Sequence, residues 1–293
     1  MEEYRIFKSP KKSGGFRTIE APCPELKEKQ KRILAKHIHD IPLSPFCHAF
    51  RSGHSIVTAC SGHIGAPYLL RFDLSNFFPS ITKPRWLFEV EKHLRNNFRS
   101  KDYATADVNC YKRMKVIRGY IEDCFFLFPG ESVARLPQGA PTSPWLSNAF
   151  LTHFDYDMAF ACQEASKYAG GPINYSRYAD DLCISGTNPR YLWALYYRAV
   201  QSLKRLGLEV NKKKTHMFKP GQRHMCVGLV VNTRPQPRRR WRRNLRAEIH
   251  NQEVAGKPLK ASTRGKINFL NMCRMQESLV GSYMEITART ADL

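Results

Sequence analysis

Residues 175–185 read YSRYADDLCIS, and the rest of the chain can be interpreted outward from this stretch. β-compatible residues lie on both sides of Asp180 and Asp181, so the pair stands where a β-hairpin would place its turn. Two adjacent carboxylates repel each other, and a buried pair must shift its pKa values or hold a cation. Asp-Asp is also common at solvated turns, because Asp adopts turn conformations readily. Taken alone, the stretch leaves both a metal site and an exposed turn open.

A third carboxylate lies far upstream, in residues 69–81, LLRFDLSNFFPSI. Asp73 ends an apolar, strand-like run, and aromatic residues follow it. Three carboxylates on two neighbouring strands match a site for two Mg²⁺ ions, which take oxygen ligands and keep water molecules that a substrate phosphate can replace. The arrangement indicates phosphoryl transfer, with Asp73, Asp180 and Asp181 as catalytic residues and metal ligands.

Three motifs now occur in chain order: FDLSNFF, then LPQGAPTSPWLSNAF at residues 136–150, then YADD. Together they resemble the A, B and C motifs in the palm of the reverse transcriptases. The resemblance implies an α+β fold of the right-hand polymerase type, with fingers, a palm built on an antiparallel sheet and a short helical thumb. We expect fingers and palm in residues 1–232 and a basic helical thumb in residues 233–293. The activity implied is that of an RNA-directed DNA polymerase.

The charge of the chain is consistent with a nucleic-acid partner. Its 47 Lys and Arg residues outnumber 25 Asp and Glu, for a net charge of +22. Such an excess favours a polyanionic partner, although a merely soluble basic protein would share it. We expect no membrane association, because no apolar run is long enough to span a bilayer and MEEYRIF does not begin like a signal peptide. Nine scattered cysteines without a CxxC pair indicate reduced thiols in a cytoplasmic protein.

The N-terminal residues 4–22 read as two short strands joined by a basic, glycine-containing turn. Lys11, Lys12 and Arg17 near this turn could close over a triphosphate, since Arg offers a bidentate fork and Lys a point charge. An ordinary basic hairpin is the alternative. By resemblance this is the fingers hairpin, and we assign nucleotide binding to Arg17 and Lys11.

Further nucleotide-binding residues follow from the resemblance. Phe78 occupies the position of the aromatic residue that blocks a ribose 2′-hydroxyl, so it would select deoxynucleotides. If the strand continues, Phe77 and Phe78 face opposite ways, and one of them is simply core. Gln138 and Gly139 would line the pocket for the nucleotide and template, in a loop leading to the N-terminus of a helix near Ser143.

Basic residues elsewhere are candidates for contact with nucleic acid. Arg51 lies near the expected template position, and the Arg-rich run around Trp241 starts a helix whose positive face could follow one strand, unless it is only a solvated face. The resemblance implies that one lysine of residues 212–214 protonates the departing pyrophosphate, and a plain basic turn is as compatible with the sequence. The full set assigned to nucleic-acid binding is Arg51, Lys212, Lys213, Arg239, Arg242 and Arg243.

Apolar spacing predicts helices over residues 24–41, most of 83–128 and 189–206, a short helix within 48–63, and a single strand over 225–232. By resemblance to the family, this strand would form the grip on the primer end. The sequence SIVTACSGH, at residues 55–63, is most similar to that of the bacterial retron enzymes. These usually carry Asn-Ala-x-x-His where residues 59–63 read ACSGH, and Val-Thr-Gly where residues 226–228 read CVG, so only His63 and Gly228 match. A non-retron defence enzyme, a group II intron-like enzyme, an RNA-templated RNA polymerase and a non-catalytic RNA scaffold stay open.

For the retron type, the resemblance implies these partners: a structured noncoding RNA as template and primer, dNTPs, a DNA product joined to the RNA, and a separate effector protein in antiphage defence. We expect no room for an RNase H, integrase, protease or maturation domain.

Overall fold

The computed structural model describes residues 3–11, 14–102 and 105–275. The chain forms two compact units, each assembled from three segments. The first unit comprises Met1–Phe50, Leu74–Met158 and Tyr197–Asn211, and the second comprises Arg51–Asp73, Ala159–Tyr196 and Lys212–Leu293. Helices alternate with antiparallel strand pairs, so the predicted α+β class is confirmed.

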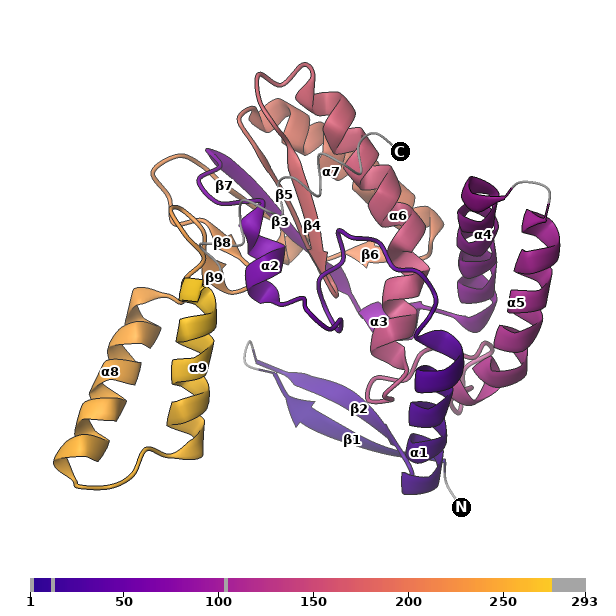
Figure 1. The fold of residues 1–293 in the computed structure, drawn as a ribbon, viewed down its shortest axis with the longest axis horizontal. Coiled ribbons are helices and arrows are strands. Elements are labelled where there is room, and N and C mark those ends of the chain that lie inside the picture. The colour runs from indigo at the N-terminus through magenta and orange to yellow at the C-terminus, as the bar shows by residue number, and fades with distance from the viewer. Residues whose placement is uncertain (1–2, 12–13, 103–104, 276–293) are drawn as a thin grey trace. The chain divides into compact units, whose positions relative to one another are not determined.

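In the first unit, β1 (Tyr4–Pro10) and β2 (Phe16–Pro22) form the predicted N-terminal hairpin, drawn in indigo in Figure 1. The amide of Lys11 donates to the carbonyl of Gly15 at 2.9 Å and closes the turn. Pro24 then starts α1 (Pro24–Ile33), since its fixed φ suits the first helical turn and its missing N–H is not needed there. The helix continues as the π-helical segment η1 (Leu34–Ile38), which confirms the helix predicted over residues 24–41.

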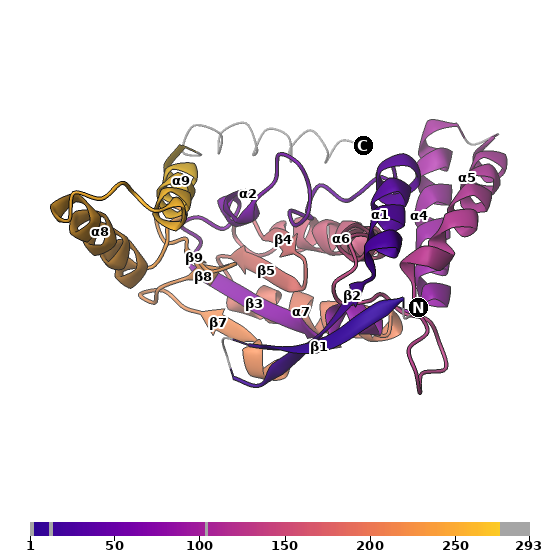
Figure 2. The ribbon, with the colours of Figure 1, turned by 90° about the horizontal axis from the view of Figure 1, so that it is seen from below.

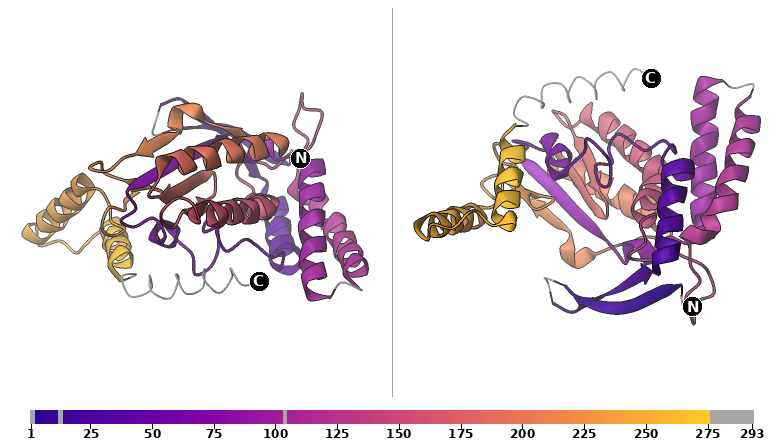
Figure 3. Two further views of the ribbon diagram at one scale, coloured as in Figure 1. Left: turned by 90° about the horizontal axis from the view of Figure 1, so that it is seen from above. Right: turned by 60° about the horizontal axis from the view of Figure 1, so that its bottom comes forward.

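Four longer helices farther along the chain follow the predicted apolar spacing. The helix pair α4 (Lys83–Lys101) and α5 (Ala106–Tyr120) lies side by side in both views of Figure 3, and α5 leads into the 3₁₀ helix η2 (Ile121–Cys124). Next comes α6 (Ser143–Ser166), whose apolar stripe at Leu146, Phe150, Phe154 and Met158 is buried as predicted. A further helix, α7 (Pro189–Arg205), ends before Gly207, which adopts φ +77 and stops it.

The central sheet has the strand order β4-β5-β3-β6, and β7 also pairs with β3. Its main strands are β3 (Tyr68–Ser75), β4 (Asn174–Tyr178) and β5 (Asp181–Gly186), and Figure 2 shows them beside one another. The shorter β6 (Glu209–Val210) and β7 (His216–Phe218) flank the 3₁₀ helix η3 (Lys212–Lys214). All pairings are antiparallel, as predicted for the palm. The first carboxylate strand extends two residues beyond its predicted end at Asp73.

The predicted single strand over residues 225–232 is wrong. These residues form a tight hairpin of β8 (Met225–Cys226) and β9 (Leu229–Val230). Val227 and Gly228 between them have φ values of 43° and 85°, the two positive values that a type I′ turn requires. The chain therefore reverses in the middle of a run that looks uniformly apolar.

The hairpin belongs to a core cluster of the second unit. Cys226 of β8 and Leu229 of β9 pack with residues of α2 (Ile56–Ser61), β3, β5 and the last described helix, α9 (Ala261–Met275). The buried members of this cluster are Val57, Cys60, Leu69, Cys183, Cys226, Leu229, Val231 and Cys273. Four of the eight buried cysteines thus belong to this one cluster.

Two helices follow in the region predicted to be the thumb. They are α8 (Arg239–Val254) and α9, which contact each other (Figure 2). Trp241 of α8 packs edge-on against Phe269 of α9, with ring centroids 5.6 Å apart. Residues 276–293 of the predicted thumb lie outside the described residues. No helix in the described ranges is long and apolar enough to cross a membrane.

Candidate active site

The three aspartates predicted to be catalytic gather at one end of the β3–β5 ladder. In the register of that ladder, Asp73 of β3 lies directly opposite Asp181, the first residue of β5. Asp180 precedes it in the turn of the β4–β5 hairpin, which Tyr178 and Asp181 close as a pair. The turn includes Ala179 at φ +56, a left-handed conformation that favours a tight reversal. The predicted hairpin and the juxtaposition of two strands are both present.

The carboxylates are partly removed from water and repel one another. Asp73 is 7% exposed. Burial, then the charges of Asp180 and Asp73, raise the pKa of Asp181 from 3.8 to about 6, while Arg71 and Lys214 act in the opposite direction. Negative charge is therefore concentrated here beyond what the fold neutralises, which is the electrostatic condition for binding a cation.

One lysine already approaches this cluster. The ammonium Nζ of Lys214 lies 2.7 Å from Oδ2 of Asp73. Lys214 ends η3, the 3₁₀ helix that also contains Lys212 and Lys213, and all three lysines are exposed. Lys214, one of the three candidates for the general acid, thus contacts a catalytic aspartate directly.

The donor set fits a divalent cation. Carboxylate oxygens are the ligands that Mg²⁺ prefers, and Lys214 holds a positive charge where such an ion would bind Asp73. Within the described part of the chain, no group of three or more His, Cys, Asp or Glu side chains stands ready to hold a metal.

In the first unit, the predicted nucleotide-binding residues lie on the β1–β2 hairpin and on the loop that precedes α6. Lys11 and Arg17 are exposed, with Arg17 across from Ser9 in the hairpin register. Lys12 lies outside the described residues.

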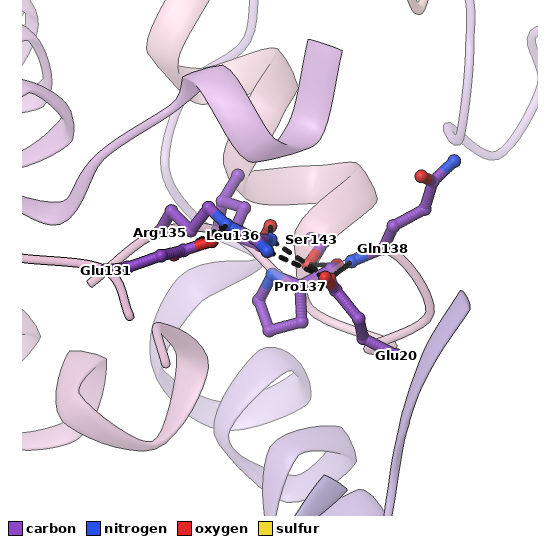
Figure 4. A network of polar contacts seen from close by, with 7 residues as sticks. All are labelled: Glu20, Glu131, Arg135, Leu136, Pro137, Gln138 and Ser143. Atoms are coloured by element: carbon purple, nitrogen blue, oxygen red, sulfur yellow. Dashed lines mark hydrogen bonds and ion pairs between the residues drawn. The ribbon is translucent and has the colours of Figure 1, made fainter. Parts of the chain in front are cut away.

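The loop residues Gln138 and Gly139 contact β2 directly, and Figure 4 shows the contact between Gln138 and Glu20. The amide of Glu20 donates to the carbonyl of Gln138 at 2.8 Å, and the carboxylate of Glu20 accepts from the amide of Gln138 at 2.7 Å. Gly139 has φ +143, and a Cβ there would lie 2.7 Å from the carbonyl oxygen of Glu20. Only glycine fits so close to the strand. The structure thus brings the loop onto the hairpin that carries Arg17.

Phe78 lies in a helical turn and not on a strand. Asn76 takes φ 46, which ends the extended backbone, and α3 (Phe77–Ser80) follows. The prediction that Phe77 and Phe78 face opposite ways assumed that both lie on a strand, and this assumption is wrong. Phe77 is nevertheless buried, while Phe78 is half-buried, and their ring centroids are 5.3 Å apart.

The basic residues predicted to contact nucleic acid occupy the second unit. Arg51 begins this unit and is half-buried. On α8, Arg239 and Arg243 are exposed and Arg242 is half-buried. Their spacing of three and four residues places them along one side of the helix, where Arg242 is also three residues from the buried Leu245 and has a buried Nε.

Several site residues escaped the sequence-based predictions. Arg177 is fully buried and donates to the carbonyl of Ala179 at 3.1 Å, beside Asp180. In the sequence, His63 is noted only because it matches a retron motif. In the structure it lies between two hydroxyls: Ser185 Oγ is 2.7 Å from Nδ1 and Ser176 Oγ is 2.8 Å from Nε2. These contacts brace the hairpin behind the two aspartates.

Comparison with protein families adds an independent finding. The sequence model of the family described as reverse transcriptase (RNA-dependent DNA polymerase) matches residues 9–231. The chain is 34% identical over 264 residues to the retron Mx65 reverse transcriptase of Myxococcus xanthus, a match that covers 89% of this chain and 58% of the relative. It is 31% identical over 253 residues to the retron Ec86 reverse transcriptase of Escherichia coli, covering 84% of this chain and 69% of the relative.

A third relative is the retron Mx162 reverse transcriptase of Myxococcus xanthus, which is 31% identical and of which 52% is covered. The chain thus spans little more than half the length of the two Myxococcus relatives. Among solved structures, telomerase from Candida albicans in complex with a telomeric RNA fragment superposes with a TM-score of 0.50, covering 80% of this chain and 46% of that chain. Apo telomerase from Candida tropicalis gives the same TM-score. At 13% sequence identity, both matches concern the fold alone and agree with the predicted right-hand polymerase.

Proposed function

The chain belongs to the reverse transcriptase family and, within it, to the retron type, and from this premise we propose that it is an RNA-directed DNA polymerase that extends a primer on a structured noncoding RNA. The observation that carries the proposal is the register that sets Asp73 opposite Asp181, with Asp180 in the adjoining turn. A scaffold that only binds RNA has no need for three carboxylates that repel one another.

Asp73, Asp180 and Asp181 are the residues that would hold two Mg²⁺ ions. When bound, these ions supply the positive charge that lowers the pKa of a primer hydroxyl and stabilises the departing pyrophosphate. Lys214 is the lysine we assign as proton donor to that leaving group, because its ammonium lies 2.7 Å from a carboxylate oxygen of Asp73. Its exposed position gives it the freedom to exchange that carboxylate for a phosphate.

The nucleotide would be held by Lys11, Arg17, Gln138 and Gly139, with Phe78 excluding a ribose 2′-hydroxyl. We assign template and product contacts to the basic residues of the second unit: Arg51, Lys212, Lys213, Arg239, Arg242 and Arg243. In this proposal residues 1–232 act as fingers and palm and residues 233–293 as the thumb. The exposed arginines of α8 support the last assignment, because neutralising phosphates requires unburied cations on one face.

The proposed product is single-stranded DNA joined to its RNA template, with a 2′-hydroxyl of that RNA as primer. A cytoplasmic location, a separate effector protein and a role in antiphage defence belong to the same proposal. The support for these features is the similarity to retron reverse transcriptases.

The test is to purify the protein from cells expressing its native locus, extract the bound nucleic acid and sequence it with and without RNase treatment. The matched control carries Asp180→Ala and Asp181→Ala together. We expect a defined DNA joined to RNA that is absent from the control. RNA without DNA in both samples would contradict the polymerase proposal and favour an RNA scaffold.

A further inference from the structure

Two charged residues of the first unit are buried together without a part in the chemistry described above. Glu20 of β2 is 4% exposed, and the side chain of Arg135 is 13% exposed. The guanidinium holds the carboxylate with two parallel bonds, Nη2 to Oε1 at 2.7 Å and Nη1 to Oε2 at 3.0 Å (Figure 4). Removing two charges from water costs about as much as their attraction returns, so such a pair contributes little net stability. Stability alone therefore does not explain why Glu20 and Arg135 are buried as a pair.

The geometry around Arg135 fixes the guanidinium in one place. Its Nε donates to both carboxylate oxygens of Glu131 at 2.8 Å. Its Cζ lies 4.2 Å from the ring centroid of Phe128, over the aromatic face. Burial works to lower the pKa of Arg135, but the hydrogen bonds to Glu20 and Glu131 outweigh it and raise the pKa. Arg135 is therefore a fixed cation that holds Glu20 in a single orientation.

The carboxylate of Glu20 has a third partner, the loop itself. Its Oε2 accepts the amide of Gln138 at 2.7 Å, and its own backbone amide donates to the Gln138 carbonyl at 2.8 Å. Ser143 Oγ donates to the carbonyl of Pro137 at 2.7 Å and holds the preceding residue. The backbone at Gln138 is thus held at its amide, its carbonyl and the preceding residue. In Figure 4 the Gln138 side chain points away from these contacts.

We propose that Glu20 and Arg135 are positioning residues for nucleotide binding, which fix the backbone of Gln138 on the hairpin so that its side-chain amide is presented in one orientation to the incoming dNTP. The inference rests on the proposed polymerase function. Arg135 acts through Glu20, and Glu20 acts through the Gln138 amide. A pair that only stabilised the fold would need the two charges but not the bond to the loop.

Steady-state kinetics separates these roles. We expect Glu20→Gln to raise the KM for dNTP about tenfold, which corresponds to about 1.4 kcal/mol of lost binding, while kcat changes much less. Glu131→Gln is the matched control, since it removes the exposed partner of Arg135 and leaves the bond from Glu20 to the loop intact, so its KM should stay near that of the wild type. A fall in thermal stability with an unchanged KM in Glu20→Gln would overturn the proposal.

The exchanged pair Glu20→Arg with Arg135→Glu sharpens the test. It restores opposite charges but leaves the Gln138 amide without its carboxylate. We expect thermal stability to recover towards the wild type while the KM for dNTP stays raised. Recovery of both would assign the pair to stability alone and refute a positioning role.

A second readout does not depend on polymerisation. Hydrogen exchange of a peptide covering residues 136–140, measured by mass spectrometry, reports on the Gln138 amide. We expect exchange there to become about tenfold faster in Glu20→Gln, as for the loss of one charged hydrogen bond, and to stay unchanged in Glu131→Gln. Unchanged exchange in Glu20→Gln would overturn the inference even if the enzyme polymerises. A wild-type protein that incorporates no dNTP but shows the faster exchange in the variant would refute the proposed function and leave the loop contact supported.

Discussion

Replacing His63 should change how the stability of the protein depends on pH. His63 is fully buried between the hydroxyls of Ser176 on β4 and Ser185 on β5. Burial lowers its pKa from 6.5 to about 4. In the unfolded chain the imidazole takes up a proton near pH 6.5, whereas in the folded chain it stays neutral until about pH 4. The stability that neutral His63 contributes is therefore present above pH 6.5 and is lost as the pH falls towards 4.

The size of the effect follows from linkage. Each unit of pKa difference is worth about 1.4 kcal/mol, so the full loss between pH 6.5 and 4 is about 3 kcal/mol, of which about 2 kcal/mol appears between pH 7.5 and 5. Many carboxylates titrate in the same range, so the difference between two proteins is the useful quantity. Glutamine does not titrate, and His63→Gln removes only the contribution of this imidazole.

Urea unfolding at pH 7.5 and 5 measures this difference. The wild type should be the more stable protein at pH 7.5, because the variant loses part of the contact with two buried hydroxyls. At pH 5 the difference in the free energy of unfolding between the wild type and His63→Gln should be smaller by about 2 kcal/mol. His250→Gln, at an exposed position of α8, is the control substitution of the same type. If the difference in unfolding free energy between the wild type and His63→Gln is the same at both pH values within about 0.5 kcal/mol, His63 is not a buried neutral histidine.

Three further predictions concern the site. Gly139→Ala should destabilise the loop contact with β2, since its Cβ would lie 2.7 Å from a backbone oxygen, and we expect a loss of about 2 kcal/mol or more in urea unfolding. Lys214→Ala should tighten the binding of Mn²⁺, used as a spectroscopic probe for Mg²⁺, because it removes the cation that competes for Asp73; weaker binding in a titration monitored by electron paramagnetic resonance would contradict this. Phe78→Val should allow ribonucleotides to be incorporated beside dNTPs. Unchanged selection for dNTPs in primer extension would show that Phe78 does not exclude the ribose 2′-hydroxyl.

Local chemistry explains which parts of the fold could be predicted. The N-terminal hairpin follows from alternating residues on both sides of a glycine-containing turn, and its turn closes as expected between Lys11 and Gly15. The α6 helix follows from Ser143 and Pro144 at its start and an apolar stripe after them. Opposing carboxylates at Asp73 and Asp181 follow because the motifs place them on adjacent strands.

The β8–β9 hairpin could not be predicted from the same rules. Its turn uses Val227 at φ 43, and a β-branched residue in the left-handed region is an outlier that propensity argues against. Only Gly228 signals a turn, and one glycine in an apolar strand also fits a bulge. Packing of the surrounding core cluster overrides the local preference. The end of the extended backbone at Asn76 was easier to predict from the sequence, because Asn adopts the left-handed conformation more readily than most residues.

The contacts that hold the site were the least predictable part. Glu20 and Arg135 are separated by 115 residues in the sequence, and each looks like an ordinary surface charge among its neighbours. Charged side chains are almost never buried unless they are paired, so burial can be inferred only once the partner is known. The same holds for Arg177, whose carbonyl acceptor lies two residues away and whose burial depends on the whole sheet.

The two kinds of support differ in charge for a physical reason. The hairpin that carries Asp180 and Asp181 is braced by the guanidinium of Arg177 at its turn and by neutral His63 through two hydroxyls. The bonds of His63 carry no net charge, so they depend less on the charge of the nearby carboxylates than an ion pair would. An ion pair in the same place would strengthen or weaken as a cation bound, because its Coulomb energy depends on every charge around it. The ionic brace, Glu20 with Arg135, is found instead at the loop that bears Gln138, where no cluster of catalytic carboxylates has been assigned. We infer that neutral bracing lets the carboxylate site exchange Lys214 for a cation without moving the strands that hold it.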